Sequence, residues 1–173
     1  MSPPFVLASE LVPGDYVCLK TKSLFGAMIR LFTRSQYDHA VLVIAPGEIV
    51  QATLRGVRRS PLSDFHGCMA VANSGEAVTG LARVTIVAAA SARVGHEYAY
   101  ALIPVIGLRR LGLRWAWLLK ISDDKDADIC SELVSAAGQT AGEDWLCGEP
   151  SPACVTPPEL SARKPFMRSV VWD

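Results

Sequence analysis

Residues 35–53 read SQYDHAVLVIAPGEIVQAT, and this stretch predicts the central element of the fold. The uninterrupted apolar run 40–45 is typical of a strand that is buried on at least one face. The Pro46-Gly47 dipeptide is a turn signal, and residues 49–53 return as a second strand. We therefore expect residues 39–54 to form a β-hairpin.

A histidine stands at the head of the first of these two strands. His39 follows Tyr37 and Asp38, and it is either an incidental half-exposed side chain or one that the sheet presents for a purpose. A short turn places Gln51 opposite residues 41–43, so its amide would meet the imidazole at best diagonally. The hairpin therefore brings His39 and Gln51 into the same region without deciding what they do.

Further strands and helices are expected on both sides of the hairpin. A turn at residues 13–15 leads into a strand at 16–20, and the apolar spacing after Ser23 suits an amphipathic helix. Several strands in the first half, with helices on either side, favour an α+β domain built around an antiparallel sheet. The other expected elements are strands at 68–73, 81–88 and 169–172, helices at 88–103 and 129–139 that stop at Pro104 and Gly138, and a short helix opened by a turn at 155–160.

The composition is that of an ordinary folding domain. The chain has 173 residues, half of them apolar and a fifth charged, which is enough for one domain with a real core. Lys and Arg total 17, as do Asp and Glu. Because the charges balance and no basic face with interleaved aromatics is present, no nucleic-acid partner is expected.

The N-terminal residues 1–15 contain no basic stretch followed by an apolar core, so no secretory signal is predicted. The longest uncharged apolar run, 98–108, is too short to span a bilayer. We expect a cytoplasmic protein by default. Export by another route, or release of a phage-encoded protein by lysis, stays open.

Five cysteines are scattered along the chain without a CxxC pair. No zinc site is therefore predicted, and neither a metal nor a cofactor is expected. Cys147 and Cys154 would pair in an oxidising compartment, but two free thiols are favoured without a secretory signal.

Cys130 is the candidate nucleophile. Asp128 is a good N-cap residue, which puts Cys130 in the first turn of the helix at 129–139. The unpaired N–H groups and the positive dipole end of a helix favour a thiolate over a thiol. A nucleophilic thiolate needs an imidazole as its proton partner and a third polar group to orient that ring. His39 and Gln51 are the best candidates for these two roles.

Four short motifs occur in an order that resembles a known enzyme family. They are PGD at 13–15, YDHAVLV at 37–43, VQAT at 50–53 and ICSELV at 129–134. Together they resemble the NlpC-type papain-like cysteine peptidases. The histidine strand precedes the cysteine helix here, which resembles the circularly permuted subgroup of that family. GHEYAYAL at 95–102, which is similar to the subgroup's glycine-tyrosine helix, and VTPPEL at 155–160 agree with it. The resemblance spans residues 11–160 and implies a single papain-like domain over residues 1–173.

The resemblance also implies roles for particular residues. Cys130 would be the nucleophile, His39 the general base and later acid, and Gln51 the residue that orients the ring. The Cys130 backbone N–H and a neighbouring donor would bind the oxyanion. Tyr37 and Asp38 would contact the substrate.

Two positions depart from the family pattern. A glutamate is commoner where Gln51 stands, and an amide cannot stabilise an imidazolium by charge. A serine is commoner where Asp38 stands, and an anion there would raise the pKa of His39 or repel an acidic substrate. His66 and His96 compete with His39 for the role of base, in an expected loop and at an expected helix start.

Three functions are compatible with the resemblance. The first is hydrolysis of an amide through an acyl-enzyme on Cys130, with cell-wall peptides containing a γ-D-glutamyl–diamino acid bond as the substrate class. The second is transfer of a fatty acyl group at a membrane, as in relatives of lecithin-retinol acyltransferase. The third is a binding protein on this fold with an inactive site. The basic-aromatic segment 108–120 would be an amphipathic cover over the active-site cleft, a peripheral membrane contact, or a segment that binds an anionic substrate.

Overall fold

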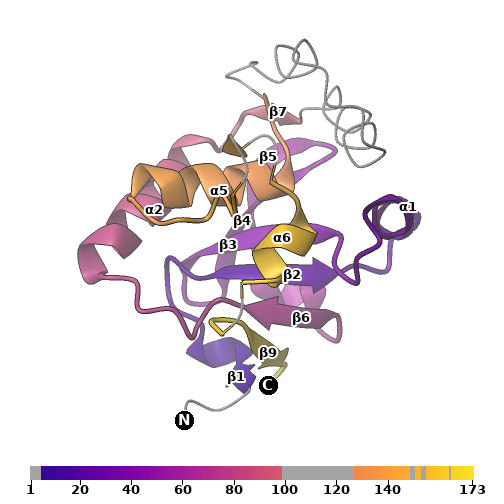
Figure 1. The fold of residues 1–173 in the computed structure, drawn as a ribbon, viewed down its shortest axis with the longest axis horizontal. Helices are drawn as coiled ribbons and strands as arrows, with labels where there is room; N and C mark the ends of the chain where they lie inside the picture. Colours follow the sequence, from indigo (N-terminus) through magenta and orange to yellow (C-terminus); the bar gives the residue numbers. More distant parts are fainter. Residues whose placement is uncertain (1–4, 99–126, 149–150, 153–154, 164) are drawn as a thin grey trace.

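The computed structural model describes residues 5–98, 127–148, 151–152, 155–163 and 165–173. Its centre is a seven-stranded sheet with the strand order β1-β9-β6-β2-β3-β4-β5 (Figure 1). Neighbouring strands are antiparallel, except that β1 and β9 are parallel. The strands are β1 (Phe5–Leu7), β2 (Tyr16–Lys20), β3 (His39–Ala45), β4 (Glu48–Thr53), β5 (Gly56–Pro61), β6 (Met69–Ala72) and β9 (Arg168–Val171).

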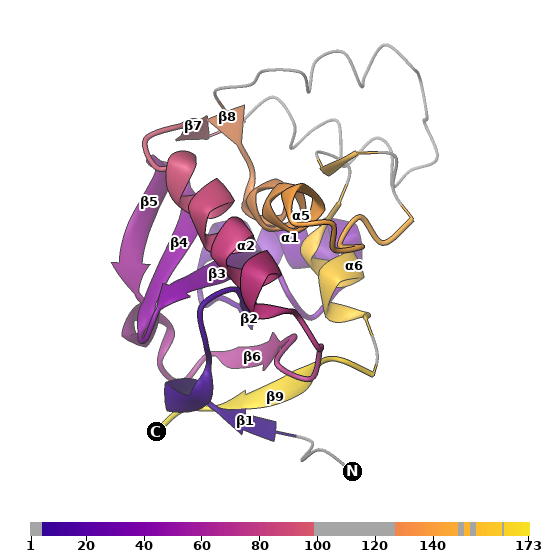
Figure 2. The same cartoon turned by 90° about the vertical axis from the view of Figure 1, so that its left-hand side faces the viewer.

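The helices lie around this sheet. Helices α2 and α5 lie side by side over one face of it, and α1 stands at the side of the molecule beyond the end of β2 (Figures 1 and 2). A second, two-stranded parallel sheet joins β7 to β8. The bounds of these elements are α1 (Leu24–Thr33), α2 (Gly80–Ala92), α5 (Cys130–Thr140), α6 (Pro157–Ser161), the 3-10 turns η1 (Ala8–Glu10) and η2 (Leu62–Phe65), β7 (Glu97–Tyr98) and β8 (Ala127–Asp128).

Strand β3 separates two apolar layers. Ala40 and Leu42 face the layer that contains α2 and α5, whereas Val41 and Val43 face the layer beneath η2. All four side chains are fully buried, and burying a side chain the size of valine or leucine contributes about 1.5–3 kcal/mol. A strand buried on both faces needs apolar residues at every position, which explains the uninterrupted run 40–45.

The predicted α+β fold and its antiparallel sheet are confirmed. The β3–β4 hairpin forms with Leu42 opposite Val50, and β2 spans the residues predicted for it. Ser23 caps α1 by accepting a hydrogen bond from the Gly26 N–H at 2.9 Å. Local patterns were sufficient for these elements because their apolar periodicity and turn residues agree.

The predicted strand at 81–88 is wrong, because these residues belong to α2. Its buried side chains are Ala82, Ile86 and Ala90, which recur every four residues as a helix requires. The Thr79 hydroxyl caps the helix by accepting from the Ala82 N–H at 3.2 Å. The β-branched residues of this segment have a local preference for strands, but packing of one helical face against the core outweighs that preference.

The predicted helix at 88–103 is also wrong over most of its described part. Helix α2 ends at Ala92, Gly95 has a φ of +100°, and Glu97–Tyr98 form β7. The proposed likeness of 95–102 to a helix therefore fails for residues 95–98. Residues 99–103 and the segment 108–120 lie outside the described residues, as do Pro104 and Cys154.

Gly138 does not end α5, contrary to the prediction. The helix continues to Thr140, and Gly138 lies within it against the fully buried ring of Trp145. A Cβ at position 138 would lie 2.3 Å from Cε3 of Trp145. The glycine is therefore explained by the close approach of the indole and not by a helix stop.

Strand β5 was not predicted, and its sequence explains why. GVRRSP carries two adjacent exposed arginines and ends in proline, so it lacks the apolar alternation of a strand. The structure places it at the edge of the sheet. Charged side chains and proline are common on edge strands because they discourage pairing with other chains.

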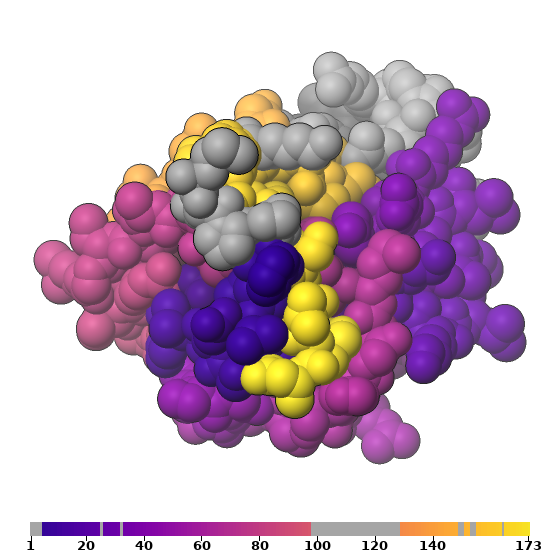
Figure 3. Space-filling model, turned by 90° about the horizontal axis from the view of Figure 1, so that it is seen from below, coloured from indigo at the N-terminus to yellow at the C-terminus, as the bar shows by residue number. Residues whose placement is uncertain are grey.

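The C-terminal segment returns to the start of the chain. Thr156 and Glu159 form the capping box of α6, as the turn at 155–160 predicts, and β9 confirms the last expected strand. Figure 3 shows the first described residues, in indigo, beside the last ones, in yellow. None of the helices in the described ranges is both long and apolar enough to cross a bilayer.

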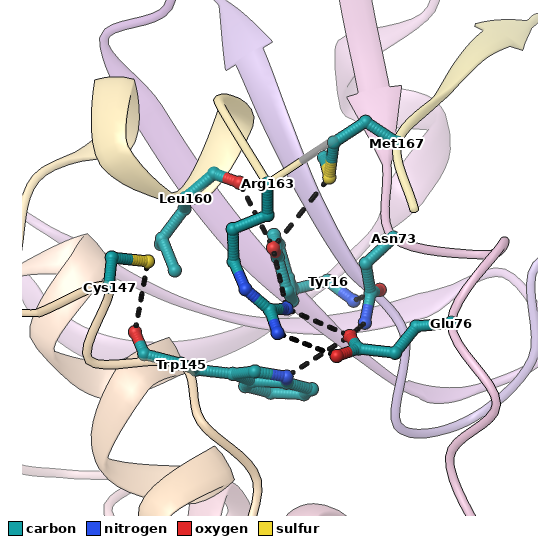
Figure 4. Close-up of polar contacts among 8 residues, drawn as sticks. All are labelled: Tyr16, Asn73, Glu76, Trp145, Cys147, Leu160, Arg163 and Met167. Atoms are coloured by element: carbon teal, nitrogen blue, oxygen red, sulfur yellow. Dashed lines mark hydrogen bonds and ion pairs between the residues drawn. The ribbon is translucent and has the colours of Figure 1, made fainter. Parts of the chain in front are cut away.

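A polar cluster attaches α6 to the sheet (Figure 4). The guanidinium of Arg163 donates to both carboxylate oxygens of Glu76, at 2.9 and 2.6 Å. Glu76 also accepts from the Trp145 Nε1–H at 3.1 Å, and the Tyr16 hydroxyl donates to the Leu160 carbonyl at 3.0 Å. The bidentate geometry and low exposure make this ion pair a structural attachment of the C-terminal segment.

Candidate active site

Cys130 is the first residue of α5. The N-cap is Ile129, with extended backbone angles of φ −99° and ψ 162°, and no side chain caps the helix. The predicted N-cap Asp128 is wrong, since Asp128 pairs with Tyr98 in the small sheet. Cys130 nevertheless lies in the first helical turn as expected, with only 6% of its surface exposed.

The Cys130 thiol interacts with His39 from the head of β3. Burial by itself raises the pKa of Cys130. The hydrogen bond and the charge of His39 lower it, and so do hydrogen bonds from the backbone N–H groups of Ala40 and Ser131. The lowering effects win, so the pKa of this thiol lies below its ordinary value. A buried thiol without such partners would shift the other way.

The pKa of His39 moves in the complementary direction. Burial lowers the pKa of His39, but the opposing interactions, those with Cys130 foremost, together outweigh burial and raise it. The hydrogen bond with Gln51 and the charge of Asp38 add to the rise. A lowered thiol pKa beside a raised imidazole pKa favours a thiolate–imidazolium pair.

Gln51 holds the other side of the imidazole. Nε2 of His39 lies 2.9 Å from Oε1 of Gln51, and the contact runs diagonally across the hairpin as the register predicts. Nε2 of Gln51 in turn donates to Oγ of Ser60 at 2.5 Å. Gln51 is 3% and Ser60 8% exposed, so both are shielded from water. This arrangement leaves Nδ1 of His39 for the thiol.

Ser60 was missed from the sequence. It lies on β5, a strand that the sequence did not predict, and a lone serine carries no motif of its own. The structure makes its role visible because Ser60 pairs with Ile49 and so shares a sheet face with Gln51, two residues farther along.

Asp38 lines the cavity next to Cys130, and its carboxylate is bonded to residues of the protein. Its carboxylate accepts from the Thr21 N–H at 3.0 Å and from the Thr21 hydroxyl at 2.5 Å, and it forms an ion pair with Arg30. The side chain is 3% exposed. With its oxygens already bonded, Asp38 is better explained as the anchor of α1 than as a ligand for substrate, although its charge still acts on His39.

Tyr37 packs against the core on the side of α2 and α5. Burial raises the pKa of its hydroxyl, with a smaller effect of Cys18. Tyr37 is absent from the lining of the cavity next to Cys130. The structure therefore does not bring it to the candidate substrate site.

A cavity of about 390 Å³ opens beside Cys130 and His39. The ring of Phe65 lies 5.7 Å from that of His39 and closes one side of it. Arg58 and Asp64 contribute one positive and one negative side chain, and both residues are exposed. The rest of the lining is Thr21, Ser23, Gly26, Ile29, Asp38, Gln51, Ala52, Thr53 and Leu54.

The two competing histidines lie elsewhere. The ring of His66 lies 6.1 Å from that of Trp172, and the His96 carbonyl accepts from the Val57 N–H at 2.9 Å. Neither lines the cavity, so the structure favours His39 as the partner of Cys130. Within the described residues there is no cluster of three or more side chains suited to hold a metal ion.

No protein-family model matches the chain, and no curated protein matches it. The function must therefore be argued from the site itself.

Proposed function

We propose that the chain is a cysteine hydrolase that cleaves an amide bond through an acyl-enzyme on Cys130. The observation that carries this proposal is the contact series Cys130–His39–Gln51, in which the thiol pKa is lowered and the imidazole pKa is raised. We further propose that the fold is a circularly permuted papain-like one, since the histidine strand precedes the cysteine helix.

In the first half-reaction the Cys130 thiolate attacks the carbonyl carbon of the amide. The Cys130 backbone N–H, in the first turn of α5, and a neighbouring donor stabilise the negative charge that develops on the carbonyl oxygen. His39, which begins as the imidazolium, gives its proton to the leaving amine as the C–N bond breaks. The products are a thioester on Cys130 and a free amine.

In the second half-reaction water replaces the thiol. His39, now neutral, takes a proton from water as the oxygen attacks the thioester carbonyl. The carbon–sulfur bond breaks, the acid leaves, and the thiolate–imidazolium pair is restored. Gln51 keeps the ring in one orientation through both steps because its own amide is held by Ser60.

The cavity supports a peptide as the substrate. Arg58 and Asp64 offer one site for a carboxylate and one for an ammonium group, and a γ-D-glutamyl–diamino acid peptide carries both. The family resemblance points to the same class of cell-wall peptides.

A second candidate is acyl transfer from a lipid through the same thiol. The apolar side chains Ile29, Leu54 and Phe65 line the cavity and would accept a hydrocarbon chain. Both candidates require an active thiol, whereas the alternative of an inactive binding protein does not.

Incubation of the purified protein with muropeptides and, separately, with phospholipid tests these alternatives. We expect amine and acid products from the peptide, and no product from Cys130→Ala. The matched control is Cys68→Ala, which alters a partly exposed thiol that does not line the cavity. If an acyl-enzyme thioester on Cys130 is trapped with phospholipid and not with muropeptides, the acyltransferase is favoured. If neither substrate reacts and iodoacetamide labels Cys130 no faster than Cys68, the protein is an inactive binding protein.

A further inference from the structure

Helix α1 turns its apolar face outward. Leu24, Met28 and Leu31 recur at the spacing of one helical face, and they are 91%, 49% and 76% exposed. A surface helix of a globular protein ordinarily buries that face against the core. The orientation of α1 therefore needs an explanation.

Polar contacts fix the orientation of α1. Gly26 is buried on the inner face, where a Cβ would lie 2.2 Å from Oδ2 of Asp38. Arg30, one turn farther on, forms an ion pair with Asp38 and donates to the Thr21 carbonyl at 2.9 Å. Because Gly26 and Arg30 are held inward, the helix cannot rotate to bury Leu24, Met28 and Leu31.

The charged residues in and beside α1 along the chain are all basic. Residues 16–37 contain four basic residues and no acidic one, in a chain whose charges balance overall. Arg30 is neutralised by Asp38, but Lys20, Lys22 and Arg34 are exposed. Exposed leucines flanked by cations are the pattern of a helix that lies in the interface of an anionic membrane.

The same helix borders the cavity. Ser23, Gly26 and Ile29 line it together with Cys130 and His39. A surface that binds the outer face of α1 would therefore lie close to the opening of the candidate active site.

We propose that α1 is an interfacial helix that docks the protein onto an anionic lipid bilayer. Leu24, Met28 and Leu31 enter the boundary between headgroups and acyl chains, and Lys20, Lys22 and Arg34 contact the anionic headgroups. A lipid surface is favoured over a protein partner because exposed cations stand before and after the helix in the sequence and residues 16–37 contain no acidic residue. This role goes beyond the proposed hydrolysis and does not depend on the chemistry of Cys130.

Vesicle co-sedimentation of the full-length protein tests the proposal. We expect binding to vesicles of phosphatidylcholine with phosphatidylglycerol, and much weaker binding to phosphatidylcholine alone or at high salt. The double variant Leu24→Ser/Leu31→Ser should bind roughly tenfold more weakly. Lys20→Gln/Lys22→Gln should lower binding to the anionic vesicles and reduce its salt dependence.

The matched control is Leu81→Ser/Val84→Ser. These two residues of α2 are 80% and 68% exposed, so the control removes a comparable amount of exposed apolar surface from another helix. It should bind as the unchanged protein does, and so should Cys130→Ala. Circular dichroism should show that every variant is folded, since the α1 and α2 substitutions lie at exposed positions and Cys130→Ala only shortens a small side chain.

Three results would overturn the proposal. The first is no binding of the unchanged protein to anionic vesicles. The second is an equal loss of binding in the α2 control and the α1 variant. The third is self-association of the unchanged protein that only the α1 variant abolishes, without vesicle binding, because the face would then serve a second copy of the chain.

Discussion

Nε2 of His39 and Oε1 of Gln51 are 2.9 Å apart, although the two residues stand diagonally and not opposite each other in the hairpin. The contact assigns one nitrogen of the imidazole to the amide oxygen and the other to Cys130. An amide fixes the ring in this way without adding charge, which sets this site apart from one with a carboxylate at position 51.

Gln51→Glu should extend activity to higher pH. A carboxylate next to the imidazolium raises the pKa of His39 further, so the alkaline limb of kcat/KM should move up by about one pH unit. Gln51→Ala should instead lower kcat/KM by about tenfold, less than the 10²–10⁴-fold effect of losing the base itself. A pH profile of peptide hydrolysis measures both. An unchanged alkaline limb in Gln51→Glu would show that residue 51 does not act on the ring.

Ser60→Ala should weaken both the fold and the catalysis. It leaves the buried Nε2 of Gln51 without an acceptor, which costs about 1–3 kcal/mol of stability. The freed amide can then rotate away from His39, so kcat should fall several-fold with little change in KM. Ser60→Thr keeps the hydroxyl and should restore activity, and the exposed Ser63→Ala is the control. Urea unfolding and steady-state kinetics separate the two effects.

The pH dependence of alkylation should distinguish Cys130 from Cys147. The pKa of Cys130 lies below the ordinary thiol value, so its reaction with iodoacetamide should already be fast near neutral pH. Burial raises the pKa of Cys147 to about 11, so Cys147 should react only in alkaline solution. Peptide mapping of the labelled protein at a series of pH values provides the measurement.

His39→Ala should raise the pKa of Cys130 and slow its alkylation near neutral pH. Without the imidazole, burial dominates and the pKa of Cys130 rises, so alkylation near pH 7 should fall by up to about tenfold for each unit of the rise. The difference should disappear at high pH, where the thiolate forms in both proteins. His66→Ala is the control, since its ring packs against Trp172. Equal slowing by both substitutions would contradict a specific Cys130–His39 pair.

Gly138→Ala and Gly80→Ala should change stability in opposite directions. A methyl group at position 138 overlaps the Trp145 ring, and such overpacking costs about 1–3 kcal/mol. Position 80 begins α2 in open space, so alanine there should stabilise by about 0.5 kcal/mol through its better helix propensity. Urea denaturation of both variants checks the two signs.

Elements with consistent local signals were predicted correctly from the sequence. The turn before Tyr16, the cap at Ser23 and the Pro46-Gly47 hairpin each combine apolar periodicity with a turn or capping residue. The prediction of a strand at residues 81–88 is wrong because a short run of β-branched residues fits a strand and a helix equally well. Only the packing of Ala82 and Ile86 against the core decides between them.

In the candidate site, too, local sequence signals predicted some features and only the tertiary structure revealed others. Residue type and helix position identified Cys130, His39 and Gln51 as a possible set, because a thiolate at a helix start needs an imidazole and an orienting group. Nothing in the sequence pointed to Ser60, which the structure places next to Gln51. The sequence suggested a substrate contact for Asp38, whereas the structure bonds that carboxylate to Thr21 and Arg30.

The sequence by itself determined the chemical groups available for a thiol-based site and those local elements whose apolar periodicity agrees with a turn or capping residue, since both depend on neighbouring residues. The tertiary structure alone decided that Cys130 meets His39, because only the packing of α5 against β3 brings these distant parts of the chain together. It likewise decided that the apolar face of α1 points outward. That orientation depends on the contact of Gly26 and Arg30 with Asp38. The apolar periodicity of the helix does not predict this contact.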